Sequence, residues 1–182
     1  MKKFFLTLII LAFSVSSSLS NTEVINALKD GGKLVFIRHA FAPGGGDPSN
    51  FKINDCSTQR NLDSTGLVQA KRIGKFFEDN NILIDQVLSS EWCRCRDTAQ
   101  KAFGNYQTFD ALNSFFSSRF ANNKDIQIKN LKEFIENWKK KKNVVFVTHY
   151  VVISEVLNKT VSSGAIIVAD KNLKVIGTIE IN

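Results

Sequence analysis

The sequence predicts an α/β protein built as a three-layer sandwich, with a mainly parallel central sheet and helices on both faces. Two apolar runs, residues 33–37 and 143–149, are continuous rather than alternating, which is typical of strands covered on both faces. Segments with helical periodicity lie between the strand-like runs, as in parallel sheets joined by crossover helices. No repeat, low-complexity tract or Pro/Gly-rich linker interrupts residues 21–182, so we predict a single domain there.

Residues 1–20 have the layout of a secretory signal peptide. Lys2 and Lys3 give a basic start, residues 4–13 an apolar run, and residues 18–20 a small-x-small ending. The apolar run is short for a membrane span, and no cysteine follows it for lipid attachment. We therefore expect cleavage near Ser20, a periplasmic or secreted mature chain, and no stable membrane insertion after cleavage. An uncleaved N-terminal anchor is the alternative.

The first half of the predicted domain holds a strand, a long loop and a helix. Residues 33–37 form the strand after a Gly-Gly turn, and residues 43–62 are rich in turn residues, which indicates a loop. Ser64 is the expected N-cap of a helix that runs to about Phe77. Apolar positions at helical spacing predict its buried face: Leu67, Ala70, Ile73, Gly74 and Phe77.

The second half alternates more regularly between strands and helices. We expect strands over residues 85–89, 106–109, 143–149, 164–170 and 173–181. We expect helices over residues 92–103, 126–140 and 150–157. The middle helix is amphipathic, with these side chains at core spacing: Ile128, Leu131, Phe134, Ile135 and Trp138. The last two strands are candidates for a hairpin at the edge of the sheet.

The chain has three cysteines, and an exported protein meets an oxidising compartment in which disulfides persist. Cys93 and Cys95 are too close in sequence to bridge each other easily within a helix. We expect Cys56 to pair with one of them, and the sequence does not decide which. Two scattered histidines and a lone CxC match no compact zinc-ligand spacing, so no metal site is expected.

The net charge of +7 favours anionic partners without naming one. The densest basic run, Lys139 to Lys142, closes a predicted helix, where it complements the helix dipole and faces solvent. We therefore expect no nucleic-acid partner. The oligomeric state is not readable from the sequence.

Both histidines of the chain follow apolar strands. In parallel sheets, ligands gather at the carboxyl ends of the strands. Arg38 and His39 come at the end of the first strand, Arg94 shortly after the strand that ends at Ser89, and His149 at the end of the strand over residues 143–149. We therefore expect two imidazoles and two guanidinium groups to meet at one edge of the sheet.

Arginine at a buried sheet edge needs an anionic partner, and its fork geometry suits phosphate. The chain offers few acidic residues nearby, so we expect an exogenous oxyanion to satisfy Arg38 and Arg94. A neutral imidazole beside a bound phosphate can attack phosphorus and form a phosphohistidine, while a second histidine stabilises the phosphoryl oxygens. This chemistry requires no metal or cofactor.

The motifs around these residues resemble those of the histidine phosphatase superfamily, which has the phosphoglycerate-mutase-like fold. "FIRHA" resembles its Arg-His-Gly signature and "SSEWCRCRDTA" its Ser-x-x-x-Arg-x-x-x-Thr-Ala segment. "QRNLDSTGLVQAKRIG" is similar to its Leu-x-x-x-Gly-x-x-Gln-Ala helix entry, and "VVFVTHYVVI" to its late strand with the second histidine. The matches occur in family order and cover most of residues 21–182. Export and size make the chain resemble the small periplasmic branch of the superfamily.

The resemblance implies roles for the matching positions. His39 would be the phosphorylated nucleophile, Arg38 and Arg94 would bind the phosphate, and His149 would be the second histidine of the pocket. Arg60, in the loop before the matched helix, would line the substrate entrance.

The sequence departs from the family pattern at three places. Ala40 replaces the usual glycine, and Asp97 stands where glutamine is common. The glutamate that many relatives use as general acid is missing from "FDALNSFF". Asp47, in the glycine-rich loop beside His39, is the first candidate for that acid, Asp110 is the second, and the third possibility is that no acid is present. A weak or absent acid would favour substrates with good leaving groups.

The sequence thus predicts an exported, metal-independent phosphomonoesterase of the histidine acid phosphatase type, acting through a phosphohistidine. The expected partner is a small phosphorylated substrate, and a cell-envelope sugar phosphate is the first hypothesis for it. The alternative is a phospholigand-binding protein with little or no turnover, because the glutamate is missing. A mutase is disfavoured, since the short chain has little material for a closing lid.

Overall fold

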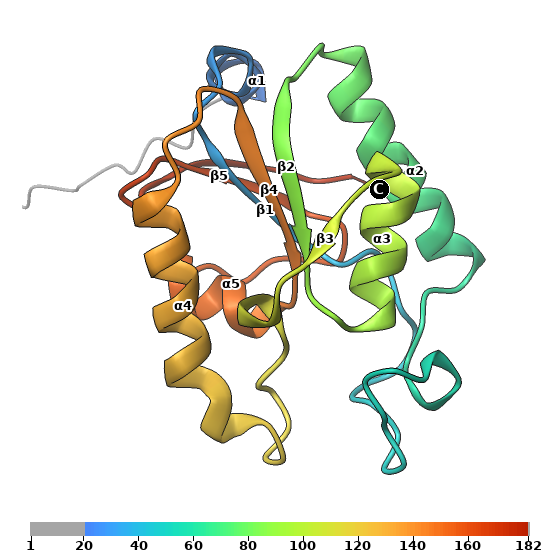
Figure 1. The fold of residues 1–182 in the computed structure, drawn as a ribbon. Coiled ribbons are helices and arrows are strands. Elements are labelled where there is room, and N and C mark those ends of the chain that lie inside the picture. Colours follow the sequence, from blue (N-terminus) through green and yellow to red (C-terminus); the bar gives the residue numbers. More distant parts are fainter. Residues whose placement is uncertain (1–20, 182) are drawn as a thin grey trace, which may run out of the picture.

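The computed structural model describes residues 21–181, in which a six-stranded sheet forms the middle layer (Figure 1). The strands are β1 (Leu34–Arg38), β2 (Ile84–Ser89), β3 (Gln107–Thr108), β4 (Asn143–Thr148), β5 (Ile166–Ala169) and β6 (Val175–Ile179). Their order across the sheet is β3-β2-β4-β1-β5-β6. The first four strands of this order pair in parallel, whereas β5 and β6 extend the sheet in the antiparallel sense.

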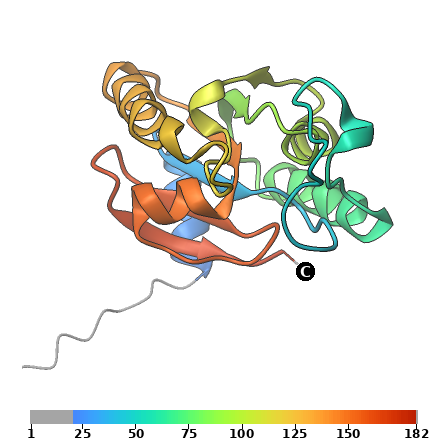
Figure 2. The same cartoon turned by 90° about the horizontal axis from the view of Figure 1, so that it is seen from below.

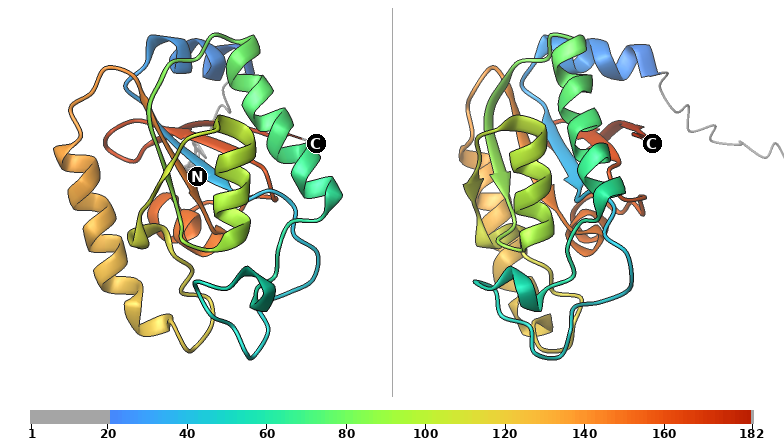
Figure 3. Two further views of the ribbon diagram at one scale, coloured as in Figure 1. Left: turned by 45° about the vertical axis from the view of Figure 1, so that its right-hand side comes forward. Right: turned by 90° about the vertical axis from the view of Figure 1, so that its right-hand side faces the viewer.

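Helices cover both faces of the sheet, so the predicted α/β three-layer architecture is confirmed (Figures 1 and 3). One face carries α1 (Asn21–Asp30), α2 (Ser64–Asp79) and α3 (Cys93–Phe103), and the other carries α4 (Lys124–Asn137) and α5 (Tyr150–Leu157). Successive residues of a strand point to opposite faces. Val35 and Ile37 of β1 therefore join the core under α1, α2 and α3, while Leu34 and Phe36 join the core under α4 and α5.

The antiparallel direction of β5 follows from the path of the chain after α5. The segment that leaves α5 stays at the carboxyl end of β1, where Gly164 N–H donates to the carbonyl oxygens of Arg38 and His39. A strand that begins beside the end of β1 can only run back along it, so Ile37 lies opposite Ile166. The β5–β6 hairpin at the sheet edge was predicted and is confirmed.

Most predicted elements appear at or near their expected bounds, and α5 matches its prediction at both ends. Ser64 was predicted as the N-cap of α2, which is wrong, because Asp63 caps the helix by accepting the Gly66 N–H at 2.8 Å. Trp138 is buried as predicted, but it is the C-cap of α4 rather than part of that helix. The sequence reading also missed α1, which buries Val24 and Leu28.

Within residues 21–181, three short 3-10 helices lie outside the main elements: Cys56–Thr58, Asp110–Leu112 and Ala121–Asn123. The first lies in the long loop between β1 and α2, and the last closes the segment that leads into α4. This loop and this segment lie at the same end of the molecule, at the bottom of Figure 3, and Figure 2 views the molecule from that end. They provide material for a site next to the ends of β1, β2 and β4.

The predicted signal peptide covers residues 1–20, which lie outside the described residues. Within the described part of the chain, no helix combines the length and apolar character needed to cross a bilayer.

Candidate active site

A cavity of about 550 Å³ opens where β1, β2 and β4 end. Its wall contains all six residues that the sequence marked for the site: Arg38, His39, Asp47, Arg60, Arg94 and His149. Asp110, the second candidate for the general acid, does not line this cavity and instead borders a neighbouring one of about 420 Å³. The structure therefore brings the predicted histidines and arginines together around one ligand-sized space.

The ends of β1 and β4 place the two histidines side by side. His39 N–H donates to the carbonyl oxygen of Thr148 at 2.9 Å, and the two imidazole centroids lie 5.4 Å apart. His149 is the N-cap of α5, and both rings are 2% exposed. Ala40, which stands where the Arg-His-Gly signature has glycine, is fully buried and its N–H donates to Thr98 Oγ1, so the turn accommodates a methyl group there.

The tautomer of His39 follows from its two hydrogen bonds. Nδ1 lies 2.8 Å from the Ala40 carbonyl oxygen, which can only accept, so Nδ1 carries the proton. Nε2 accepts from Arg94 Nε at 3.2 Å and therefore holds a lone pair. Burial, reinforced by Arg94, lowers the pKa of His39 well below its usual value and keeps the ring neutral. A neutral imidazole with an unprotonated Nε2 is the form that can attack phosphorus.

Arg94 is the centre of the polar network. It follows Trp92 and Cys93 at the start of α3 and is 3% exposed. Its Nη1 forms an ion pair with Asp47 Oδ1 at 2.8 Å, and its Nη2 lies 3.4 Å from His149 Nδ1. For Arg94, the expectation that an exogenous oxyanion rather than a nearby acidic residue would satisfy the guanidinium is wrong, because the glycine-rich loop folds back and supplies Asp47.

Asp47 is surrounded by hydrogen-bond donors. Oδ1 accepts from Arg94 Nη1 and from the backbone N–H of Arg60 at 3.1 Å. Oδ2 accepts from the Trp92 indole N–H at 3.0 Å and from Arg94 Nη2 at 3.3 Å. Both oxygens of the Asp47 side chain are therefore occupied by N–H donors.

Arg38 presents unused donor capacity at the cavity. Its Nη1 donates to the Val161 carbonyl oxygen at 2.7 Å, and its guanidinium lies over the Tyr150 ring at 5.4 Å. Its Nε is buried and has no partner among the described residues. A buried donor without an acceptor costs stability, and an oxyanion in the cavity would relieve that cost.

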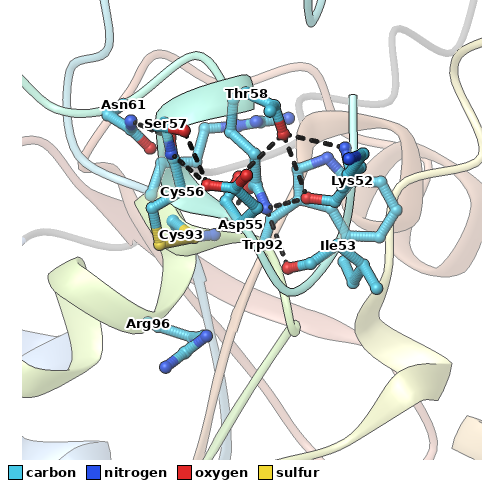
Figure 4. Close-up of a disulfide and its surroundings, with 12 residues drawn as sticks. Lys52, Ile53, Asp55, Cys56, Ser57, Thr58, Asn61, Trp92, Cys93 and Arg96 are labelled. Carbon is cyan, nitrogen blue, oxygen red and sulfur yellow. Dashed lines mark hydrogen bonds between the residues drawn. A yellow bond between two sulfur atoms is a disulfide. The ribbon is translucent and has the colours of Figure 1, made fainter. Parts of the chain in front are cut away.

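The long loop is fastened to the start of α3 by a disulfide between Cys56 and Cys93, which are 5.7 Å apart at Cα (Figure 4). The prediction that Cys56 pairs with one member of the CxC motif is confirmed, and Cys95 is left as a buried free thiol. Gln59 adds to this attachment, since it donates to the Lys52 and Ile53 carbonyl oxygens and accepts the Cys93 N–H. The loop that carries Asp47 and Arg60 is thus held against Arg94.

Part of the cavity wall is aromatic, and the sequence reading did not predict it. This part includes Phe41, Phe51, Trp92, Phe116, Phe120 and Tyr150. Phe116 is 62% exposed at the rim and packs on Tyr150 with centroids 5.7 Å apart. Arg60 also lines the cavity, where it donates to the Ala42 and Gly46 carbonyl oxygens. The fifteen phenylalanines of the chain were a compositional signal for such a wall, but not for its place.

Other proteins of known structure share this fold. A protein from Agrobacterium tumefaciens assigned as the phosphohistidine phosphatase SixA is 20% identical, with a TM-score of 0.56 over 82% of this chain and 97% of that one. A phosphoglycerate mutase from Thermus thermophilus is 16% identical, with a TM-score of 0.59 over 82% of this chain and 99% of that one.

A third structure holds an oxyanion. It is the protein histidine phosphatase SixA in complex with tungstate, which is 12% identical with a TM-score of 0.54 over 81% of this chain and 96% of that one. No family model matches the sequence, and no curated protein matches it. At these identities the comparisons establish a common fold, and the chemistry depends on the site itself.

Proposed function

We propose that this chain is a phosphomonoesterase of the histidine phosphatase superfamily that works through a phosphohistidine at His39. The observation that carries the proposal is the state of His39 Nε2, which is neutral, holds a lone pair and lies 3.2 Å from a guanidinium nitrogen at a ligand-sized cavity. The fold shared with phosphohistidine phosphatases and a phosphoglycerate mutase supports the same reaction class.

The residues divide the work of phosphoryl transfer between binding and attack. Arg38 and Arg94 would hold the phosphoryl oxygens, since guanidinium forks match phosphate and neutralise the charge of the transferred group. His39 Nε2 forms a bond to phosphorus while the ester P–O bond breaks, and the alcohol leaves. Water then attacks phosphorus, the P–N bond breaks, and inorganic phosphate leaves with the free imidazole restored.

Export and a sugar phosphate substrate remain part of the proposal. The layout of residues 1–20 and the Cys56–Cys93 disulfide are consistent with an oxidising, extracytoplasmic location. The cavity volume of about 550 Å³ is within the range for drug-sized ligands and exceeds what a lone phosphate needs. Its aromatic wall and serine hydroxyls offer stacking and hydrogen bonds to a sugar ring: Ser49, Ser114, Ser117 and Ser163. We therefore propose a cell-envelope sugar phosphate as the substrate.

The test is turnover of an aryl phosphate by the mature protein and by His39→Ala. We expect hydrolysis by the wild type in the presence of a chelator, and loss of activity in His39→Ala by roughly 10⁴-fold or more, because the nucleophile is gone. Rapid quenching should trap an acid-labile, base-stable phosphoenzyme in the wild type only. Undiminished hydrolysis by His39→Ala would refute the proposal.

A phospholigand-binding protein without turnover is the second candidate, and it is favoured by a cavity wall in which residues 21–181 place no glutamate. It predicts that phosphate or vanadate binds to the wild type in calorimetry and that this binding is lost in Arg94→Ala, while every phosphoester in a substrate panel stays intact. Measurable turnover of any ester would exclude this candidate.

A further inference from the structure

The cavity has a well-placed nucleophile, but its carboxylate is poorly suited to donate a proton to the leaving oxygen. Among the described residues, Asp47 is the only carboxylate in the wall, and both of its oxygens are occupied by N–H donors. His149 is another titratable group near His39, and its orientation is fixed by contacts that can be followed atom by atom.

The first constraint on His149 begins at Glu91. The carboxylate of Glu91 can only accept, so Asn113 Nδ2 donates to it at 2.6 Å and Asn113 Oδ1 must face the other way. Oδ1 then accepts from Ser90 Oγ at 3.0 Å. Because the Ser90 hydroxyl donates its one proton to Asn113 Oδ1, its oxygen acts as the acceptor for an N–H at His149 Nε2, 3.0 Å away. His149 therefore carries its proton on Nε2.

Arg94 provides a second, independent constraint with the same result. Its Nη2 lies 3.4 Å from His149 Nδ1 and can only donate, so Nδ1 holds the lone pair. Cys95 Sγ also lies 3.4 Å from Nε2, and burial raises the pKa of this thiol to about 12, so it is a neutral thiol whose sulfur can accept weakly from the Nε2 proton. Nε2 is thus bound to the buried Ser90, and Nδ1 lies on the side of Arg94, which lines the cavity together with His149.

We propose that His149, through Nδ1, is the proton donor to the leaving oxygen in place of Asp47, and that Ser90 and Asn113 are positioning residues that fix its tautomer. This inference rests on the proposed function, because it concerns the first step of phosphoryl transfer. It also explains how the site could process poor leaving groups without the missing glutamate.

The proton balance of this route closes. A phosphomonoester monoanion brings one proton, which passes to His149 Nδ1 as Arg94 Nη2 turns from Nδ1 to a phosphoryl oxygen. His39 Nε2 then bonds to phosphorus, the P–O bond breaks, and the Nδ1 proton goes to the leaving oxygen to give the alcohol. In the second step, water attacks phosphorus and passes a proton to Nδ1. The P–N bond breaks, and His149 returns that proton to the departing phosphate or to solvent.

The charges around His149 determine when Nδ1 is protonated. The groups that face or surround it are Arg94 and Cys95 of α3, His39 and Arg38 at the end of β1, and Arg60 and Asp47 of the loop. Burial and Arg94 lower the pKa of His149 well below its usual value. A bound phosphoryl group supplies the compensating negative charge, so protonation and substrate binding are coupled.

The experiment compares leaving groups. General acid catalysis is worth about 10²–10⁴-fold for a poor leaving group and little for a good one. His149→Gln keeps an amide N–H that can reach Ser90 but cannot transfer a proton. We expect this variant to lose at least ~10²-fold in kcat/KM for an alkyl phosphate such as glycerol 1-phosphate. The loss of kcat/KM for 2,4-dinitrophenyl phosphate should be at least tenfold smaller, because this good leaving group needs no proton and the variant loses only one transition-state contact. Asp47→Asn should affect the two substrates equally.

The outcomes separate this inference from the proposed function. If the wild type hydrolyses both esters and His149→Gln slows them by the same factor, the inference fails while the function stands. A leaving-group-dependent loss in Asp47→Asn but not in His149→Gln would assign the acid to Asp47. If the wild type hydrolyses neither ester, the proposed function itself fails.

Ser90 is tested through the pH profile. Ser90→Ala removes the hydroxyl partner of His149 Nε2 and leaves the weaker Cys95 thiol beside it, so the ring can turn and the competent tautomer is less populated. We expect kcat for the alkyl phosphate to fall with little change in KM, and the pH optimum to move. Ser89→Ala is the matched control, since its hydroxyl is equally buried at the end of β2 but donates to the Ser90 carbonyl oxygen. Equal pH profiles in Ser90→Ala and the wild type would overturn the positioning role.

Discussion

Arg94 connects the reactive groups of the cavity floor. A single guanidinium reaches His39 Nε2, His149 Nδ1 and both oxygens of Asp47. Asp47 provides negative charge beside Arg94, as a phosphoryl group would in a complex. An incoming oxyanion therefore needs hydrogen bonds to only some of the Arg94 N–H groups, while Asp47 continues to bind the others and holds the guanidinium in position. This arrangement orients the guanidinium before the substrate arrives, which lowers the cost of binding.

The Nε of Arg38, which has no partner among the described residues, gives a test at the same scale. Arg38→Lys keeps the charge but removes the Nε donor and the fork. Loss of a hydrogen bond to a charged group is worth about 1.5–3 kcal/mol, so the affinity for phosphate or vanadate should fall by roughly ten- to a hundredfold in calorimetry. Arg119→Lys at the cavity rim is the control, and it should change the affinity by much less. An unchanged affinity in Arg38→Lys would show that only the charge matters, and equal losses in both variants would show that Arg38 has no special role.

The sequence could predict the pair of histidines with Arg38 and Arg94, because strand ends in parallel sheets converge regardless of loop details. It could not predict that Asp47 pairs with Arg94, since that contact depends on how the long loop folds back. The contacts that lead from Glu91 through Asn113 to Ser90 were equally unpredictable from the sequence. It joins two connections that are distant in sequence, and each of its members is ordinary by itself.

Among the elements, the loop between β1 and α2 has the least regular structure and the most direct effect on the site. It is attached through the disulfide, through Gln59 and through the Asp47–Arg94 ion pair. Cys56 lies on the exposed side of the disulfide and Cys93 is buried, so a reductant can approach from the Cys56 side (Figure 4).

Removal of the disulfide should weaken both the fold and substrate binding. A loop closed across 37 residues is worth roughly 4 kcal/mol in the chain-entropy model, so Cys56→Ser with Cys93→Ser should lower the free energy of unfolding in urea by about 2–4 kcal/mol. KM should rise more than kcat falls, because Asp47 and Arg60 move with the loop while His39 stays on β1. A reductant should reproduce these effects in the wild type and change nothing in the double variant. An unchanged KM in the double variant and in the reduced wild type would show that the disulfide does not position the site.

The limits of prediction for the elements have physical causes. The continuous apolar runs of β1 and β4 favour strands covered on both faces, because a strand with one solvated face alternates between apolar and polar residues. α1 buries only Val24 and Leu28, one turn apart, and two apolar positions are too few to distinguish a helix from a loop. Ser64 and Asp63 are both good N-caps, so their order in the chain did not decide which side chain would fold back onto the helix.

For the molecule as a whole, the site has a cost in stability. The two histidines are 2% exposed and neutral, and their pKa values are lowered mainly by burial and then by Arg94. The unfolded chain exposes both rings, which then titrate near their ordinary value of about 6.5. Below that pH the unfolded state binds more protons than the folded state, so protonation favours unfolding.

Stability should therefore fall as the pH decreases through about 6.5, and it should be independent of these two groups above that value. Each histidine that is neutral in the folded state and protonated in the unfolded state contributes about 1.4 kcal/mol per pH unit, so the pair gives a slope of up to about 2.7 kcal/mol per unit. Urea unfolding between pH 7.5 and pH 5.5 measures this slope, and a His39→Gln, His149→Gln double variant is the control that lacks both groups. Carboxylates titrate lower and affect both proteins alike. Saturating phosphate should reduce the slope in the wild type, because a bound anion favours protonated imidazole. If wild type and double variant lose stability in parallel over this range, the two rings are not held neutral, and His39 would not be poised as a nucleophile.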